Sequence, residues 1–245
     1  MISSESIDKL CTKIGQQQPF WPNIKERFEA LPAFKKKLPL MISQYAQDFS
    51  ELYLDLALEN ICKFAEFNST ILPHYHSTNP LKQGEYKLYH NYMRRVIINC
   101  NNNIFWEYDQ IIHVDNIPVV LEMKIRQWNT GKKRKRKQQN GSYTFEKNNC
   151  VKNNLRPELY NRKLDPVRKM FGQEVGYIMI IPCDQYESTQ HSPLDSIVGQ
   201  FIHNNGKIVP FYTDRLTFRE HVREKVKEFG YPLKEEPQQS IIYFL

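Results

Sequence analysis

The stretch 105–128, FWEYDQIIHVDNIPVVLEMKIRQW, constrains the fold of this chain more than any other, because Ile- and Val-rich runs flank the dipeptide Asp115-Asn116. Asp and Asn tolerate the positive φ angles that a two-residue turn requires, so the pattern predicts two antiparallel strands. Pro118 stands at the start of the second strand, where a missing N–H is tolerated on a sheet edge or facing solvent. A β-hairpin is therefore the first structural expectation.

The predicted register gathers ionisable side chains on one face of this hairpin. Pairing outward from the turn puts Asp109 directly across from Glu122. Two steps further out, Glu107 faces Lys124, and strand periodicity returns to the same face every second residue. The other face is mostly apolar and is expected to pack inward, with Trp106, Tyr108, Gln110, Leu121, Met123 and Ile125.

Two carboxylates that face each other across a ladder repel unless a positive charge lies between them. A divalent cation is a natural partner, and Mg²⁺ prefers one or two carboxylates plus substrate phosphate to an all-protein cage. Lys124 would then stand beside the metal, where it could orient or help to deprotonate an attacking water, or stabilise charge on phosphorus. These residue types together suit metal-assisted phosphodiester cleavage.

At these residues the sequence resembles the PD-(D/E)XK nuclease superfamily, in which an Asp on one strand is followed by Glu-x-Lys on the next. The match is Asp109, then Glu122-Met123-Lys124 after the hydrophobic residues 119–121. Tyr108 rather than Pro precedes the Asp. The resemblance implies an α/β fold, a restriction-endonuclease-like mixed β-sheet core flanked by helices, with a helical N-terminal region.

The same resemblance implies roles for individual residues. Asp109 and Glu122 would bind Mg²⁺, for which Mn²⁺ could substitute, the backbone carbonyl of Met123 would add a ligand, and Lys124 would be catalytic. A helix before the hairpin often supplies a further acid in this superfamily, and a helical pattern runs from about 40 to 67. Glu59 is preferred over Glu51 because it is closer in sequence to the strands, although a solvated helix face explains it equally well.

An ordinary amphipathic hairpin with Glu and Lys on its solvated side is the alternative explanation of the motif, since exposed cross-strand pairs contribute little. The excess of three carboxylates over one lysine favours the nuclease hypothesis. The rival hypotheses are a non-catalytic nucleic-acid-binding protein that retains the nuclease fold, and a protein-interaction factor whose basic run serves only in nuclear import.

Positive charge points to a polyanionic partner or an acidic membrane surface, because the net charge is +7 and the pI is near 9.0. Six consecutive basic residues follow the motif, and they could bind the DNA backbone, act as a nuclear import signal or form a solvated loop. Proximity to Lys124 favours DNA. The residues expected to contact nucleic acid are Lys132, Lys133, Arg134, Lys135, Arg136, Lys137, Arg162 and Arg168.

Two regions are expected along the chain: a helical N-terminal region at 1–39, and a nuclease core at 40–245 with a C-terminal helix and strand. Pattern and composition predict a helix or pair of helices near 155–173, a buried strand at 175–182 and an amphipathic helix at 215–229. The final apolar residues 241–245 are expected to dock as a terminal strand.

The N-terminal sequence lacks the apolar core of a signal peptide, and no apolar run is long enough to cross a bilayer. An intracellular, cytoplasmic protein without membrane contact is expected, and its five widely spaced cysteines are expected to be free thiols. The sequence thus predicts a Mg²⁺-dependent deoxyribonuclease. Because double-strand cutting usually needs two active centres, a homodimer is a further expectation, which no segment of the sequence proves.

Overall fold

The chain folds as a mixed α/β protein in the computed structural model, which describes residues 4–16, 21–30, 38–63, 69–91, 95–101, 104–125, 134–137, 143–146, 155–172, 174–190 and 206–235. The helices within these ranges are α1 (Ser4–Gln16), α2 (Trp21–Glu29), α4 (Ile42–Lys63), α6 (Pro157–Phe171), α7 (Cys183–Gln190) and α9 (Arg215–Glu228). None of these described helices combines the length and apolar character that a bilayer span requires.

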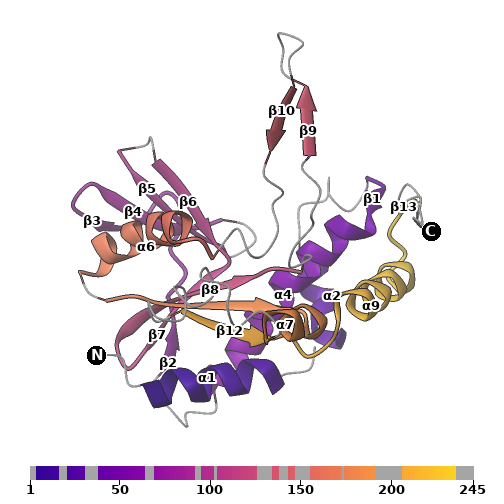
Figure 1. Ribbon diagram of the computed structural model, residues 1–245, viewed down its shortest axis with the longest axis horizontal. Helices are drawn as coiled ribbons and strands as arrows, with labels where there is room; N and C mark the ends of the chain where they lie inside the picture. The colour runs from indigo at the N-terminus through magenta and orange to yellow at the C-terminus, as the bar shows by residue number, and fades with distance from the viewer. Residues whose placement is uncertain are drawn as a thin grey trace.

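A five-stranded mixed sheet occupies the middle of the molecule (Figure 1). In spatial order its strands are β12 (Gly206–Pro210), β11 (Gly176–Ile181), β8 (Ile117–Met123), β7 (Gln110–Val114) and β2 (Ser69–Ile71). β11 runs parallel to both β12 and β8, whereas β7 is antiparallel to β8 and β2. Every residue of β11 is buried, as expected for an apolar strand with a parallel neighbour on each side. The buried strand predicted at 175–182 is confirmed.

The hairpin predicted around Asp115-Asn116 is also confirmed, with Val114 paired to Ile117. Asp115 and Asn116 have φ angles of 51° and 65°, the positive values that a two-residue hairpin turn needs. Pro118 pairs with His113 on β7 and precedes Val119, the first residue of β8 that pairs with β11. A proline N is therefore tolerated there, because no β11 residue pairs at that position.

The strand before the turn is shorter than predicted, because the chain changes sheets at Asp109. Residues Ile104–Tyr108 form β6 at the edge of a second, antiparallel sheet, which also contains β5 (Val96–Cys100), β4 (Tyr86–His90) and β3 (Leu81–Gln83). Glu107 thus lies across from Ile97 of β5, and the expectation that it faces Lys124 is wrong. The physical reason is the bend at Asp109, which ends the ladder with β8 at Gln110.

The bend also redirects the apolar side chains that precede it. Tyr108 is fully buried and Trp106 is partly buried, and both pack in the cluster formed by α6 and the two sheets. Leu121 and Met123 belong to the opposite cluster, together with the partly buried Ile125. The expectation of inward packing is therefore confirmed for the buried Tyr108, Gln110, Leu121 and Met123, but β6 and β8 do not share one inward face, because side-chain alternation is not continuous through the bend.

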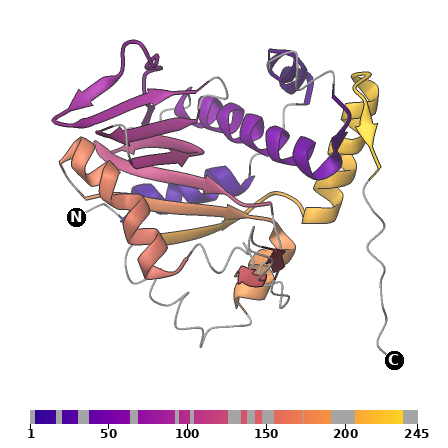
Figure 2. The same ribbon diagram turned by 90° about the horizontal axis from the view of Figure 1, so that it is seen from above.

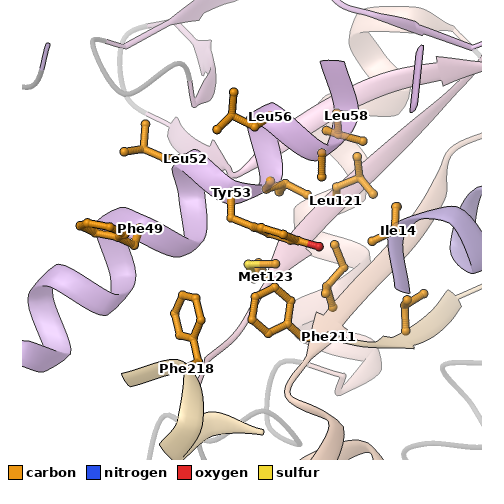
Figure 3. Packing of buried hydrophobic residues seen from close by; sticks show 14 of the residues in the cluster. Ile14, Phe49, Leu52, Tyr53, Leu56, Leu58, Leu121, Met123, Phe211 and Phe218 are labelled. Carbon is orange, nitrogen blue, oxygen red and sulfur yellow. The ribbon is translucent and has the colours of Figure 1, made fainter. Parts of the chain in front are cut away.

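Helices cover the two faces of the five-stranded sheet differently (Figure 2). α4, together with α1 and α9, packs on one face, where its Tyr53 lies beside Leu121 and Met123 (Figure 3). α6 packs on the other face and also contacts the second sheet through Tyr160, Leu164 and Val167. The end of β8 and the bend at Asp109 consequently lie where the two sheets and α6 meet.

The N-terminal helices share the hydrophobic cluster of α4. The Phe28 ring of α2 lies 4.8 Å from the Phe49 ring of α4, and α1 packs against β12. Near the other end of the chain, β13 (Leu233–Lys234) pairs in parallel with β1 (Leu40–Met41). The described cysteines Cys11, Cys100 and Cys183 are free thiols, whereas the strand expected at 241–245 lies outside the described residues.

Two short strands follow the motif and form a separate antiparallel ribbon, β9 (Arg134–Lys137) and β10 (Tyr143–Glu146). Figure 1 shows this ribbon projecting away from the sheets. β9 consists entirely of basic residues, paired with the Tyr-Thr-Phe-Glu sequence of β10. The basic run expected to be a loop is thus partly a strand, because pairing with β10 supplies its backbone hydrogen bonds.

Candidate functional site

Asp109 lies at the junction of the two sheets, beside the end of β8. Its Oδ2 accepts a hydrogen bond from the backbone N–H of Met123 at 2.7 Å. The β7–β8 ladder ends at the pair Gln110–Leu121, so the Asp109 carboxylate takes up an N–H that a longer ladder would have bonded to backbone. This contact brings the Asp109 side chain next to the Glu-x-Lys segment, but Asp109 does not pair with Glu122 in the ladder as the sequence predicted, because the ladder ends at Gln110.

Glu122 is the most deeply buried charged group of the cluster, with its side chain only 2% exposed. An ammonium group contacts each of its carboxylate oxygens. Lys124 Nζ lies 2.5 Å from Oε2, and Lys163 Nζ lies 2.6 Å from Oε1. Lys124 comes from the end of β8 and Lys163 from α6 on the same face of the sheet, so Glu122 is held between two structural layers.

The two carboxyl groups have opposite pKa shifts. Burial raises the pKa of Asp109 above its usual range, and Glu122 raises it further, while Lys124, the Met123 N–H and Arg95 oppose the increase. Burial would also raise the pKa of Glu122, but Lys124 and Lys163 outweigh burial and hold that pKa below its usual range. Glu122 is therefore ionised at neutral pH, and Asp109 is the carboxyl group of the pair that takes up a proton more readily.

Tyr177 of β11 adds a neutral phenol to the same region. It is fully buried, and burial raises the pKa of its hydroxyl well above the usual value, with further contributions from Glu122 and Asp109. The hydroxyl therefore stays protonated and adds no charge. Because both carboxyl groups act on the pKa of this one hydroxyl, Asp109 and Glu122 both lie near Tyr177.

The backbone of Met123 is oriented toward Asp109. The N–H of the next residue, Lys124, donates to Ile180 O of β11 at 2.9 Å, whereas the Met123 N–H donates to Asp109. In an extended strand the N–H and C=O of one residue point to the same side, and successive residues alternate. The Met123 carbonyl is therefore directed to the Asp109 side of β8, as required if it is to act with the two carboxylates.

These groups fit a divalent cation that takes few protein ligands. One carboxylate from the bend before β7, one carboxylate from β8 and one carbonyl are hard oxygen donors, the kind that Mg²⁺ and Mn²⁺ prefer. Within the described ranges, no group of three or more His, Cys, Asp or Glu side chains is arranged to hold a metal ion. Two carboxylates and one carbonyl would leave coordination positions of such an ion for water or phosphate.

A second charged cluster adjoins the first through Arg95. Its guanidinium forms ion pairs with Glu51 of α4 and with Glu107 of β6, and its positive charge also acts to lower the pKa of Asp109. Glu51 is 7% exposed and Arg95 is 18% exposed, so the Arg95–Glu51 pair is largely buried. On the same helix, Asp55 Oδ1 accepts a hydrogen bond from Gln110 Nε2 at 3.2 Å. α4 therefore directs Glu51 and Asp55 toward the strands of the site.

Glu59, the acid preferred from the sequence, has a different environment. It accepts hydrogen bonds from Arg27 Nη2 of α2, with distances of 2.6 Å to Oε1 and 2.5 Å to Oε2. The charged groups that most affect the pKa of Asp109 are Lys124, Glu122 and Arg95, and those that most affect the pKa of Glu122 are Lys124 and Lys163. The structure therefore links Glu51, the second candidate, to the site through Arg95, and it does not bring Glu59 there.

The residues predicted to contact nucleic acid fall on β9, on α6 and in a part of the chain outside the described residues. Arg134, Lys135, Arg136 and Lys137 make up β9, and Lys132 and Lys133 lie outside the described residues. Arg162 is exposed on α6, with its guanidinium 5.7 Å from the centre of the Trp106 ring. Arg168, further along α6, is half-buried near Tyr160.

Sequence reasoning missed Lys163 and Arg95 as members of the site. Lys163 falls within the buried arc of α6, three residues after Tyr160 and next to Leu164, and a lysine in an apolar arc is a recognisable signal. Arg95 directly precedes the apolar strand β5, but its two acidic partners are distant in sequence. No local pattern could have identified them.

Comparison with protein-family models, with curated proteins and with solved structures finds no match for this chain. Functional assignment therefore depends on the geometry of the site.

Proposed function

We propose that this protein is a Mg²⁺-dependent endonuclease that hydrolyses phosphodiester bonds in DNA, with Mn²⁺ able to substitute. The observation that carries the proposal is that Asp109, at the bend before β7, bonds the Met123 N–H directly after Glu122 on β8, with the Lys124 ammonium 2.5 Å from Glu122. Two acidic oxygen donors can hold a divalent cation, and an adjacent ammonium can stabilise negative charge on a phosphoryl group.

The order of elements supports a restriction-endonuclease-like, PD-(D/E)XK core within the mixed α/β fold. Helix α4 is followed by the β7–β8 hairpin, then by α6 and by β11, which is parallel to β8. The Asp precedes the first hairpin strand and the Glu-x-Lys ends the second. This is the arrangement that the resemblance of Asp109 and Glu122-Met123-Lys124 implies.

Asp109, Glu122 and the Met123 carbonyl would hold the metal. A bound Mg²⁺ supplies Lewis-acid stabilisation of the phosphoryl oxygens and polarises water. The Lys124 ammonium orients the attacking water and stabilises the negative charge that grows on the phosphoryl group. Burial of Glu122 strengthens these electrostatic interactions, because few water molecules screen them.

DNA is the substrate class that the surface charge favours. The net charge is +7, and the entirely basic strand β9 follows Lys124 by only ten residues. Ten residues of extended chain reach about 35 Å at most, so the ribbon and the site can engage one duplex. Contacts from β9 and the exposed Arg162 to phosphates would provide sequence-independent affinity. A homodimer would supply two active centres for double-strand cutting. Separately, the basic sequence of β9 also fits a nuclear import signal in an intracellular protein.

The decisive experiment incubates supercoiled plasmid with the wild-type protein and its variants in Mg²⁺ and in EDTA. The wild type is expected to nick or linearise plasmid only with metal. Asp109→Asn, which can still accept the Met123 N–H, and Lys124→Met should each lower the rate by about 10²-fold or more. Lys87→Met, on the exposed side of β4, is the control. Equal cleavage by all four proteins would exclude this site.

A non-catalytic nucleic-acid-binding protein with the same fold is the second candidate. It is favoured by one observation: both oxygens of Glu122 already have ammonium partners, which leaves that carboxylate electrostatically satisfied without metal. Plasmid that is bound and never cut, in Mg²⁺ and in Mn²⁺ alike, would support this candidate.

A further inference from the structure

Lys163 has no assigned role in the proposed chemistry, although it is as close to Glu122 as Lys124 is. Its Nζ lies 2.6 Å from Glu122 Oε1, and its side chain is only 15% exposed. Lysines seldom lie in such an environment without a function or a structural partner, because burying an ammonium costs free energy unless it is paired. Glu122 is that partner here.

The placement of Lys163 is built into the fold. Its backbone carbonyl accepts a hydrogen bond from the buried Tyr108 hydroxyl at 2.6 Å, which ties α6 to β6 one residue before Asp109. The same face of α6 is buried against the sheets through Tyr160, Leu164 and Val167. The Lys163 ammonium is thus held over Glu122 by packing on both sides, unlike a mobile surface lysine.

The charges of the four central groups explain what this placement does. Asp109 and Glu122 carry two negative charges when ionised, and Lys124 and Lys163 carry two positive charges, so the metal-free cluster is formally neutral. A divalent cation that entered with both lysines in place would leave two uncompensated positive charges in a poorly solvated region, which is unfavourable. Metal binding and the Lys163–Glu122 contact therefore oppose each other.

We propose that Lys163 is a positioning residue that occupies Glu122 in the metal-free protein and is released when the metal binds. The inference rests on the proposed function, because it assumes that Asp109 and Glu122 hold a divalent cation. In the metal-free state the 2.6 Å contact with Lys163 fixes the Glu122 carboxylate in place. After release, its ammonium is available to the phosphodiester anion of the substrate, which offsets one of the two uncompensated positive charges.

The test measures Mn²⁺ affinity of the purified protein without nucleic acid, by isothermal titration calorimetry. Lys163→Met removes the competing charge and is expected to bind Mn²⁺ about tenfold more tightly than the wild type, within the usual range for coupling between two ligands. Lys163→Arg keeps the charge and should keep wild-type affinity. Lys169→Met makes the same charge change on an exposed position of α6, and its affinity should also equal that of the wild type.

A second measurement uses the unaltered protein, so it does not depend on the folding of a variant. Acetic anhydride labelling followed by mass spectrometry should show Lys163 protected in EDTA and several-fold more reactive in saturating Mn²⁺, with Lys169 unchanged. A purely structural Lys163 would show no such response to metal.

The outcomes separate the inference from the proposed function. Equal Mn²⁺ affinities for the wild type and Lys163→Met, with labelling insensitive to metal, would overturn the role of Lys163. The metal site itself would still stand in that case if Asp109→Asn abolished binding. Absence of Mn²⁺ binding in the wild type and in Lys163→Met would remove the proposed function and the inference together.

Discussion

The Tyr108 hydroxyl donates a 2.6 Å hydrogen bond to the backbone carbonyl of Lys163, which joins the strand before Asp109 to the helix above Glu122. Tyr108→Phe should lower the free energy of unfolding by about 1–2 kcal/mol, because it leaves a buried carbonyl without this donor. Urea denaturation measures the loss. Tyr89→Phe is the control. Tyr89 is half-buried, and its hydroxyl accepts a hydrogen bond from Asn99 at 3.2 Å, so its loss should change the free energy of unfolding less. Equal losses of unfolding free energy in the two variants would show that the Tyr108 hydrogen bond stabilises the fold no more than the Tyr89 one does.

Asp109 should make stability depend on pH in a defined direction. Burial and Glu122 raise its pKa in the folded protein, so its contribution to stability is present below the usual Asp value and is lost as pH rises through the folded pKa. Asp109→Asn has no carboxyl group to ionise, so it does not lose this stability as the pH rises. The variant should therefore gain stability relative to the wild type between acidic and neutral pH, with a Tm change of about 2–4 °C for each kcal/mol. Thermal melts in EDTA across pH measure it.

Glu122→Gln is the matched contrast, because Lys124 and Lys163 lower the pKa of Glu122. The stability from ionised Glu122 is present above the usual Glu value and is lost as pH falls through the folded pKa. Glu122→Gln should thus be most destabilised near neutral pH, with the difference from the wild type shrinking in acid. Parallel pH profiles for the Asp109 and Glu122 variants would contradict the opposite shifts.

Arg95 joins α4 to β6 through Glu51 and Glu107. Arg95→Met leaves the buried Glu51 carboxylate without this partner, and breaking such a pair from one side costs about 3–5 kcal/mol. Equilibrium urea unfolding measures the change. Lys9→Met breaks an exposed pair with Glu5 and should leave the free energy of unfolding nearly unchanged. A loss for Arg95→Met as small as that for Lys9→Met would show that the pair between α4 and β6 does not stabilise the fold.

The basic strand β9 should govern the salt dependence of DNA binding. Replacing Lys135 and Lys137 with Gln removes two positive charges, so affinity should fall for all sequences alike and the slope of log K against log salt should decrease by about two. Fluorescence anisotropy over a salt series measures both. Mn²⁺ affinity, which depends on Asp109 and Glu122, should not change. An unchanged salt slope would place the DNA contacts elsewhere.

Local chemistry explains why the hairpin and the buried strand could be predicted. Asp115 and Asn116 accept positive φ angles, and the apolar residues of 176–181 suit a strand with neighbours on both sides. Alternation along β8 then puts Glu122 and Lys124 on one face. Pairing residues outward from the turn predicted that Asp109 lies near these two residues.

The rest of the site depends on contacts between segments that are distant in sequence. Glu59 and Glu51 have equivalent local patterns, and only the packing of α2 and Arg95 distinguishes them. Lys163 reaches Glu122 across 41 residues because Tyr108 and the core fix α6 over β8. The sequence by itself determined the hairpin, its turn and the acidic face near β8, since these follow from backbone preferences and strand periodicity. Only the tertiary structure decided where the strand bends at Asp109 and which cations neutralise the carboxylates, because burial and long-range packing set both.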